Sequence, residues 1–219
     1  MKVIGLIPFW MDYGEDRDLK KLAGRYLINY SIELLNSSEL IDDVIIYSSD
    51  DRILEYIENN LKVKYKKRPI YLDDEKILTE QIINEFISDD EADIIVLLHP
   101  YCPFMQVSTI NKCIENVKNS KFDSAFPALE FYKYAWFKGK PLNFDKNKYS
   151  SKLQSLDKII LEQGLMYVFK RNVFLSNVNR IGSNPYIKII DNFEGLEVNS
   201  NKELEIAELI VNSGMLYGQ

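Results

Sequence analysis

The chain has 219 residues, a length typical of one compact domain, and its 46% of hydrophobic residues suffice for a buried core. Lys and Arg number 27 against 33 Asp and Glu, and the resulting formal charge of −6 argues against a non-specific nucleic-acid binder while allowing one cationic pocket for a phosphorylated ligand. The uncharged stretch Ile94–Val107 is too short to cross a bilayer and contains Pro100 and Pro103, and the N-terminus lacks the pattern of a signal peptide. We therefore expect a cytoplasmic protein that contacts neither nucleic acid nor membrane.

Short apolar runs alternate with amphipathic segments along the chain, which is the pattern of an α/β sheet. Six segments are predicted as strands, and the last two are expected to pair: Lys2–Pro8, Asp43–Ser48, Lys62–Pro69, Asp93–Leu98, Leu165–Lys170 and Ile187–Asp191. Helices are predicted over Leu22–Leu35, after caps at Asp50, Thr79 and Ser108, and after a capping box of Ser200 and Glu203, with Gly214 following the last turn.

The stretch Leu129–Phe144 differs from the rest of the chain because aromatic residues dominate it. Lys138-Gly139-Lys140 has the composition of a hairpin turn, and the aromatic residues before it alternate as on a strand. Aromatic residues are enriched at protein interfaces. We therefore predict a single α/β domain over residues 1–219, with a β-rich insertion at about residues 128–163 that forms a dimer interface.

Cysteine and histidine limit the chemistry that the chain can perform. Cys102 and Cys113 are its only cysteines, and reduced structural thiols are expected in preference to a disulfide. His99 is the only histidine, which excludes multi-histidine zinc sites and leaves it as a pocket residue, a general base or a loop histidine. Ligands of open parallel sheets bind in the loops after the strands. The loops that qualify are Pro8–Lys21, Ser48–Asp51, His99–Met105 and Glu194–Asn201.

Seven segments in and beside these loops carry a common pattern. They are Leu19–Ile28, Ile45–Asp51, Lys67–Pro69, Leu97–Phe104, Gly164–Phe169, Glu197–Asn199 and Ala207-Glu208. In this order they resemble the acylneuraminate cytidylyltransferase (CMP-sialic acid synthetase) family, whose relatives act on other nonulosonic acids and on 3-deoxy-manno-octulosonate. The resemblance covers nearly the whole chain.

This resemblance implies a Rossmann-like, three-layer nucleotidyltransferase fold of the glycosyltransferase-A type. It also implies a transferase that joins CMP from CTP to an acidic sugar of the nonulosonic type, releases pyrophosphate, uses Mg²⁺ and serves cell-surface glycan synthesis as a homodimer. Phosphoryl-type transfer needs cations around the triphosphate and carboxylates that hold the metal.

The resemblance also assigns roles to individual residues. Arg17, Lys21 and His99 are the catalytic candidates, and Arg17 and Lys21 would hold phosphates together with Gly14. Glu197 and Asn199 are the candidate magnesium ligands, because a carboxylate and an amide oxygen can ligate this ion. The candidates for the nucleotide and substrate pocket are Gly14, Ser48, Asp50, Arg68, Pro100 and Gln163.

The chain departs from the family in its first loop, where Phe9 and Tyr13 fall near the positions of the phosphate-binding Arg and Lys. Phe9 and Trp10 are expected to be core, pocket wall or a stacking surface for a base. Arg68 has the alternative role of a surface ion pair. Two other functions therefore stay open: a catalytically inactive homologue that acts as a binding or scaffold subunit, and a nucleotidyltransferase with another acceptor or nucleotide. The acidic residues of the loop, which would repel a triphosphate, are Asp12, Glu15, Asp16 and Asp18.

Overall fold

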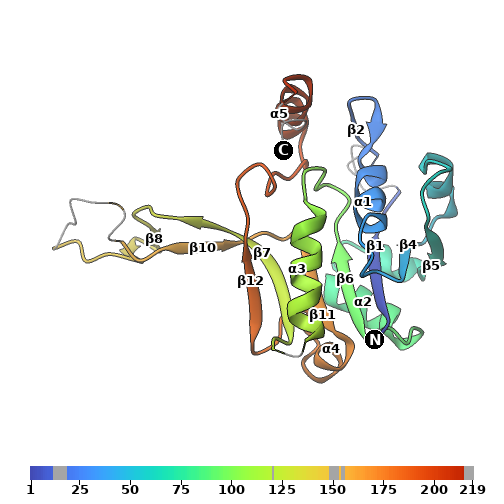
Figure 1. The fold of residues 1–219 in the computed structure, drawn as a ribbon, viewed down its shortest axis with the longest axis horizontal. Coiled ribbons are helices and arrows are strands. Elements are labelled where there is room, and N and C mark those ends of the chain that lie inside the picture. Colours follow the sequence, from blue (N-terminus) through green and yellow to red (C-terminus); the bar gives the residue numbers. More distant parts are fainter. Residues whose placement is uncertain (12–18, 120, 148–152, 154–155, 215–219) are drawn as a thin grey trace.

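The computed structural model describes residues 1–11, 19–119, 121–147, 153 and 156–214 (Figure 1). Its main sheet has the strand order β10-β7-β11-β6-β1-β4-β5, and β12 pairs with β7 beside this path. The strands are β1 (Val3–Pro8), β4 (Asp43–Ser48), β5 (Lys64–Lys67), β6 (Ile94–Leu98), β7 (Ser124–Phe131), β10 (Ile159–Glu162), β11 (Met166–Lys170) and β12 (Pro185–Ile189). The helices are α1 (Leu27–Asn36), α2 (Thr79–Ser88), α3 (Val107–Lys118), α4 (Arg171–Asn177) and α5 (Asn201–Asn212), with short 3-10 helices η1 (Asp51–Tyr56) and η2 (Ile70–Asp73).

The centre of the sheet is parallel. β1 pairs with β4 and with β6, and β4 pairs with the edge strand β5, all in the same direction. Each residue of β1 and of β6 is buried, as expected for continuous apolar runs that are covered on both faces. The carboxyl ends of β1, β4, β5 and β6 therefore lie at one edge of the sheet. β11 runs antiparallel to β6 and begins at that edge.

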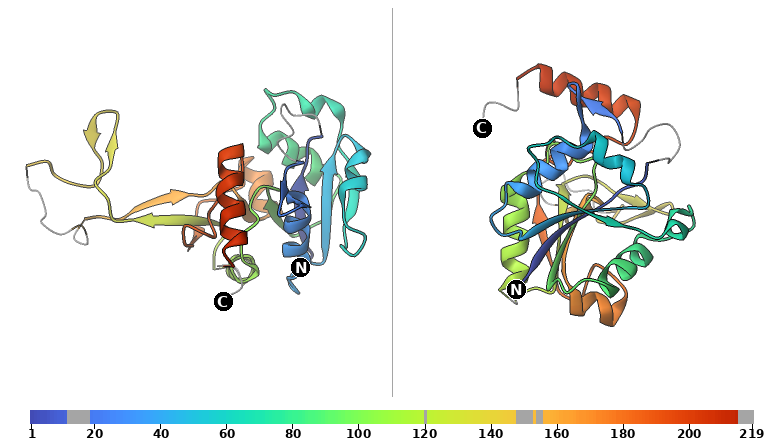
Figure 2. Two further views of the ribbon diagram at one scale, coloured as in Figure 1. Left: turned by 90° about the horizontal axis from the view of Figure 1, so that it is seen from above. Right: turned by 90° about the vertical axis from the view of Figure 1, so that its right-hand side faces the viewer.

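Helices cover the two faces of the sheet and give the molecule three layers (Figure 2). On one face, Ile32 of α1 and Ile110 of α3 belong to the same buried cluster as Val96 of β6. On the other face, Phe86 of α2 and Phe174 of α4 pack in a second cluster. The fold is thus the predicted three-layer α/β arrangement.

A third, smaller cluster lies where α5 meets a short hairpin of β2 (Lys21–Leu22) and β3 (Arg25–Tyr26). Leu22 of the hairpin and Ala207 of α5 are both buried in it. In Figure 1 this helix and hairpin lie together at the upper end of the molecule, above the carboxyl ends of the parallel strands. The C-terminal helix therefore joins the region that the central strands point toward.

An arm projects from the body of the protein (Figure 1). β7 continues past the sheet and pairs antiparallel with β10, with Phe131 opposite Ile159. Farther out, β8 (Trp136–Phe137) pairs with β9 (Lys140–Pro141) through a tight turn. Lys138 and Gly139 have φ values of +49° and +76° in this turn, which confirms the predicted hairpin.

Several predicted boundaries differ from the structure. The first helix begins at Leu27 because Ala23 and Gly24 adopt positive φ values of +50° and +81° and turn the chain into the β2–β3 hairpin. The helices after Thr79 and Ser108 have Leu78 and Gln106 as their N-cap residues. The segment after Asp50 is a 3-10 helix. The strands Leu165–Lys170 and Ile187–Asp191 were predicted to pair, but β12 pairs with β7.

Other local signals are confirmed. The Asp50 carboxylate accepts a hydrogen bond from the Arg52 N–H at 3.0 Å and caps η1. Ser200 and Glu203 form the predicted capping box of α5, and Gly214 follows with a φ of +71°. Among the described residues, no helix has the length and apolar character needed to span a membrane.

A substitution at Leu97 of β6 tests how much the buried cluster beneath α2 and α4 stabilises the fold. The side chain is 0% exposed, so Leu97→Ala should lower the free energy of unfolding by about 3 kcal/mol through lost burial and the cavity left behind. The same substitution at Leu209, which is 72% exposed on α5, should change it by less than about 0.5 kcal/mol. Urea unfolding of both variants checks this, and equal effects would contradict the observed burial.

Candidate functional site

The edge where the parallel strands end brings most of the predicted site residues together. The Phe9 N–H donates to the Tyr47 carbonyl at 3.0 Å, which fixes the start of the first loop beside β4. The Arg68 N–H donates to the Ser48 carbonyl at 2.8 Å, and the His99 N–H donates to the Leu165 carbonyl at 2.9 Å. These backbone bonds place Trp10, Ser48, Arg68 and His99 along one edge. Gly14 and Arg17 lie outside the described residues.

Arg68 is the most deeply buried charge at this edge, with 0% exposure. Its guanidinium lies 4.2 Å from the centre of the Trp10 ring, forms an ion pair with Asp73 at 2.6 Å and donates to the Tyr47 carbonyl at 3.4 Å. A buried charge is tolerated only with such partners. The alternative of a surface ion pair for Arg68 is therefore wrong in one respect: the pair exists, but the guanidinium is buried beneath Trp10.

A cleft of about 270 Å³ opens above this buried guanidinium. Its wall contains the indole of Trp10, whose ring packs against the Arg68 guanidinium. The carboxylates that line it belong to Asp50, Asp51 and Asp73. The lining residues are Trp10, Met11, Ser49, Asp50, Asp51, Ile70 and Asp73. The cleft combines an aromatic surface with hydrogen-bond acceptors, which is a setting that a planar ligand with N–H donors can use.

Ser48 and Asp50 form the turn that enters this cleft from β4. Ser48 is 0% exposed, and its Oγ accepts a hydrogen bond from the Asp50 N–H at 3.3 Å. The Asp50 carboxylate accepts from the Arg52 Nε at 2.8 Å, and the hydrogen bonds from Arg52 lower the pKa of this carboxyl. Asp50 therefore stays ionised and fixed in place at neutral pH.

His99 and Pro100 begin the loop after β6. The His99 ring stacks on Tyr101, with ring centres 5.3 Å apart and planes 14° from parallel. The His99 carbonyl accepts hydrogen bonds from the Cys102 Sγ at 2.9 Å and from the Ser31 Oγ at 3.5 Å. The predicted site residue Gln163 lies close by, because it is two residues before Leu165, whose carbonyl binds the His99 N–H.

Glu197 and Asn199 lie side by side in the loop before α5. The Asn199 Nδ2 donates to the Glu197 carboxylate at 2.5 Å, and the Asn199 Oδ1 is buried and accepts no hydrogen bond from any described residue. The Lys20 Nζ donates to the Asn199 carbonyl at 3.5 Å, which brings a cation of the first loop to this pair. The Val198 N–H donates to the Tyr101 carbonyl at 2.9 Å, so the pair is attached to the loop that carries His99.

The residue types of this pair suit Mg²⁺, which prefers oxygen ligands and commonly takes only one or two carboxylates beside water and substrate phosphates. A carboxylate and a buried amide oxygen that lacks a partner among the described residues meet this requirement. No cluster of three or more His, Cys, Asp or Glu side chains suited to a metal occurs in the described part of the chain. A magnesium ion here would therefore rely on the substrate for much of its coordination.

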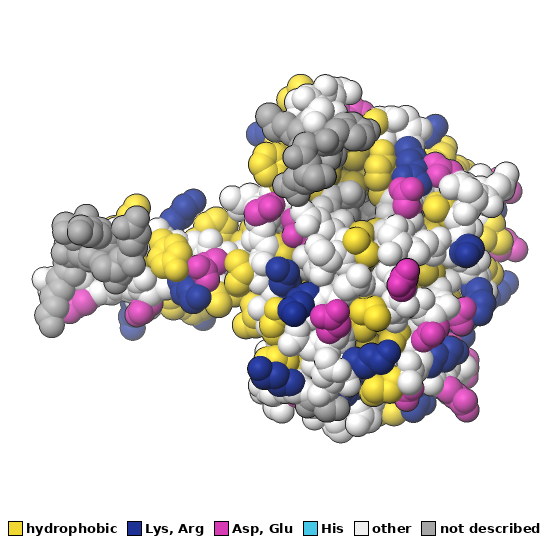
Figure 3. Space-filling model, viewed as in Figure 1, with side chains coloured by type: hydrophobic (Ala, Val, Ile, Leu, Met, Phe, Trp, Pro, Cys, Tyr) yellow, Lys and Arg dark blue, Asp and Glu magenta, His cyan; other side chains and the backbone are white. Residues whose placement is uncertain are grey.

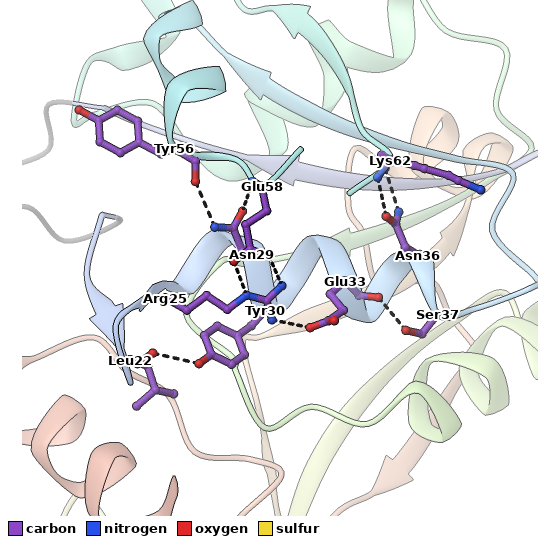
Figure 4. A network of polar contacts seen from close by, with 10 residues as sticks. All are labelled: Leu22, Arg25, Asn29, Tyr30, Glu33, Asn36, Ser37, Tyr56, Glu58 and Lys62. Carbon is purple, nitrogen blue, oxygen red and sulfur yellow. Dashed lines mark hydrogen bonds and ion pairs between the residues drawn. The ribbon is translucent and has the colours of Figure 1, made fainter. Parts of the chain in front are cut away.

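The hairpin that carries Lys21 is held by a polar network on α1 (Figure 4). The Arg25 Nε and Nη2 donate to the two carboxylate oxygens of Glu58, each at 2.8 Å, and Nη1 donates to the Glu33 carboxylate at 2.5 Å. The Tyr30 hydroxyl donates to the Leu22 carbonyl at 2.9 Å. Lys21 itself is exposed, and its Nζ lies 4.5 Å from the centre of the Tyr26 ring.

Three contributors to the site carried little or no sequence signal. Asp73, the charge partner of Arg68, follows it by five residues without a recognisable motif. Arg25 has partners on both α1 and the segment after η1. Glu194 is 6% exposed, and burial raises the pKa of its carboxyl. The segment between β12 and α5 holds three acids, Asp191, Glu194 and Glu197, and nothing in its sequence indicates that Glu194 is the buried one.

Two solved structures share this fold over almost their whole lengths. One is a CMP:2-keto-3-deoxy-manno-octonic acid synthetase complexed with CTP, with a TM-score of 0.72, 14% identity, and coverage of 97% of this chain and 99% of that chain. The other is a 4-diphosphocytidyl-2C-methyl-D-erythritol synthase from Anaerococcus prevotii, with a TM-score of 0.65, 11% identity and coverage of 96% of both chains. The fold is therefore the Rossmann-like fold of nucleotidyltransferases, as predicted.

Sequence comparison gives the family. The pattern of the cytidylyltransferase family matches residues 15–190, more than half of the chain, and the chain belongs to this family. It is 25% identical over 219 residues to a 3-deoxy-manno-octulosonate cytidylyltransferase from Thermodesulfovibrio yellowstonii, covering 95% of this chain and 84% of the relative. It is 20% identical over 209 residues to post-translational flagellin modification protein B from Campylobacter coli, covering 90% and 88%. The predicted membership in a cytidylyltransferase family is confirmed, and the acylneuraminate branch stays a prediction.

The ion pair beneath the cleft should contribute measurably to stability. Asp73→Asn removes the charge partner of a fully buried guanidinium and should lower the free energy of unfolding by about 2 kcal/mol. Asp43→Asn breaks a more exposed pair with Lys64 and should cost less than about 1 kcal/mol. Urea unfolding compares the two, and a smaller effect at Asp73 than at Asp43 would contradict the importance of the buried pair.

Proposed function

We propose that this protein transfers CMP from CTP to a hydroxyl group of an acidic sugar and releases pyrophosphate. Family membership and the relative that acts as a 3-deoxy-manno-octulosonate cytidylyltransferase support this activity. The observation that carries the proposal is the Glu197–Asn199 pair, where a carboxylate, a buried amide oxygen and the Lys20 ammonium group meet beside the loop after β6. An anionic ligand with a metal ion needs this combination of oxygen ligands and a cation.

In the proposed reaction the sugar hydroxyl oxygen attacks the α-phosphorus of CTP, and the bond from this phosphorus to the pyrophosphate oxygen breaks. Lys20, Lys21 and Arg17 would supply positive charge for the phosphates. A Mg²⁺ ion held by Glu197 and Asn199 would neutralise further phosphate charge. His99 is the candidate that would accept the hydroxyl proton, because it begins the loop to which the Glu197–Asn199 pair is attached.

The cleft above Arg68 is the proposed site of the cytosine base. Trp10 offers an aromatic wall, and the carboxylates around the cleft would accept hydrogen bonds from the exocyclic amine of cytosine. Ser48 and Asp50 shape its entrance, and the paired Arg68 keeps Trp10 in position. Because of these contacts, we propose that Arg68 positions Trp10 and does not bind phosphate directly.

The acceptor is proposed to be an acidic sugar of the nonulosonic type. The relative named for 3-deoxy-manno-octulosonate, which is an acidic sugar, supports this broader class. Gln163 and Pro100 lie near His99 and would border the sugar.

We also propose that two copies associate through the arm. Between residues 128 and 163 the sequence has seven Lys and four Asp or Glu, so the arm is positively charged although the whole chain carries −6. Trp136 and Phe137 are 57% and 61% exposed on it, and Figure 3 shows hydrophobic and basic side chains together along the arm. A basic, aromatic arm complements the acidic body of a second copy.

The arm proposal predicts a dimer that one substitution disrupts. Sedimentation velocity should give the wild-type protein twice the 25.6 kDa mass of one chain, and Trp136→Asp should shift it toward the monomer because a charge would enter the interface. Leu209→Asp, at an exposed apolar residue on α5, is the matched control and should leave the dimer intact. A monomeric wild type, or equal shifts for both variants, would refute the role of the arm.

The activity proposal predicts pyrophosphate release that depends on CTP, Mg²⁺ and an acidic sugar. Glu197→Gln should slow the reaction by about 100-fold, because it removes the only charged candidate metal ligand of the pair. Glu205→Gln makes the same chemical change at an exposed position of α5 and should leave the rate unchanged. The assay should offer 3-deoxy-manno-octulosonate and several nonulosonic acids, with pyrophosphate as the readout.

If no sugar is turned over, nucleotide binding distinguishes a nucleotidyltransferase of another specificity from a binding or scaffold subunit. CTP at about 100 times its dissociation constant should stabilise the folded protein by about 2.7 kcal/mol, which thermal unfolding detects. Stabilisation by another nucleotide alone would favour a nucleotidyltransferase of different specificity. If no nucleotide stabilises the protein, the activity proposal is wrong and a binding or scaffold role takes its place.

A further inference from the structure

Glu194 is a buried acid that the proposed reaction does not use. It lies in the loop between β12 and α5, three residues before Glu197, and is 6% exposed, although carboxylates are rarely buried. Its Oε1 accepts a hydrogen bond from the Gln106 N–H at 3.1 Å, and the Thr109 side chain hydrogen-bonds to the same carboxyl. The carboxylate is therefore bound to the first turn of α3 through two hydrogen bonds.

These contacts make Glu194 a capping group for a helix that lies 88 residues earlier in the chain. Gln106 is the N-cap residue of α3, and within the described part of the chain its own side chain does not cap the helix. A carboxylate at this position accepts from otherwise unpaired N–H groups and interacts favourably with the helix dipole. Because α3 follows directly on the loop that begins at His99, Glu194 ties its own loop to the loop after β6.

A second bond ties the same two loops together. The Val198 N–H donates to the Tyr101 carbonyl at 2.9 Å, and Val198 is 0% exposed. On the other side of Glu194, the Asp191 carboxylate accepts from the N–H groups of Phe193 and Glu194 at 2.8 and 2.9 Å and folds the start of the loop. The segment between Glu194 and Val198 is thus held at both ends, and Glu197 lies within it.

We propose that Glu194 is a positioning residue that holds Glu197 and Asn199 against the loop after β6. This inference rests on the proposed metal-binding role of the pair. Without the contacts of Glu194, the Val198 N–H to Tyr101 bond and the packing of Val198 with Phe104 would be left to hold the pair near His99, and the pair would be less precisely placed. The affinity for Mg²⁺ in the presence of CTP should then fall, whereas the binding of CTP alone, at the cleft beside Trp10, should not change.

The test compares Glu194→Ala and Glu194→Gln with the wild type in calorimetric titrations of the full chain with CTP over a range of Mg²⁺ concentrations. Glu194→Ala should raise the half-saturating Mg²⁺ concentration by about 10-fold, as the loss of residues that orient metal ligands commonly does. Glu194→Gln keeps an oxygen acceptor for the Gln106 N–H but loses the charge at the helix terminus, so its shift should be about threefold. Hydrogen exchange of the Val198 amide should accelerate in the same order.

Asp123→Asn is the matched control. Asp123 also holds a loop, since its carboxylate accepts from the Asn184 N–H at 2.8 Å and from the Ser183 hydroxyl at 3.2 Å. It precedes β7 at the opposite edge of the sheet, so this variant should lose stability without any change in the Mg²⁺ requirement or in Val198 exchange.

Three results would overturn the inference. In the first, both Glu194 variants keep the wild-type Mg²⁺ requirement. In the second, they lose stability as Asp123→Asn does but leave Val198 exchange unchanged, which would make Glu194 a residue of stability alone. In the third, the wild type itself binds CTP without any influence of Mg²⁺; the metal role of Glu197 and Asn199 then fails, and that failure is seen before any variant is made.

Discussion

β1 forms backbone hydrogen bonds with β4 on one side and with β6 on the other, and all three strands run in the same direction. This parallel pairing requires each strand to return across the sheet through a helix, and it stacks all three carboxyl ends at one edge. The start of the first loop at Phe9, the Ser48 turn and the start of the His99 loop meet there because of this geometry. The neighbouring pairing of β4 with β5 adds Arg68 to the same edge. The cleft therefore depends on the direction of these four short strands, and so does the His99 loop to which the Glu197–Asn199 pair is attached.

The central parallel strands could be predicted because burial on both faces requires continuous apolar runs in the sequence, whereas β7 was not predicted although its first five residues are buried as well. β4 has the predicted bounds, and β1 and β6 each begin one residue later than predicted. The start of α1 was missed because Ala23 adopts a positive φ, which non-glycine residues rarely do. The partner of β12 was also missed, since strand pairing between distant segments depends on the packing of α3 and is not visible in local composition.

The candidate site could be predicted in position but not in its interactions. Strand ends located Ser48 and His99, and the family resemblance located Arg68. The burial of the Arg68 guanidinium escaped prediction because its partners come from three segments, one of which carries Trp10. Glu194 binds the start of α3 from a segment 88 residues away. A contact over this separation likewise leaves no signal in the local sequence. Residue types reveal which chemistry is available, whereas tertiary contacts decide which groups remain accessible to a ligand.

The outermost strand of the parallel part, β5, ends the sheet with the sequence Lys64-Tyr65-Lys66-Lys67. An uncovered strand edge presents backbone groups that could pair with a strand from another molecule, and such pairing leads to aggregation. Lys64 and Lys67 are exposed there, so a second copy of the same edge would bring like charges together. The lysines of β5 therefore protect the protein against uncontrolled growth of the sheet, and they do so on the side of the molecule opposite the arm (Figure 1).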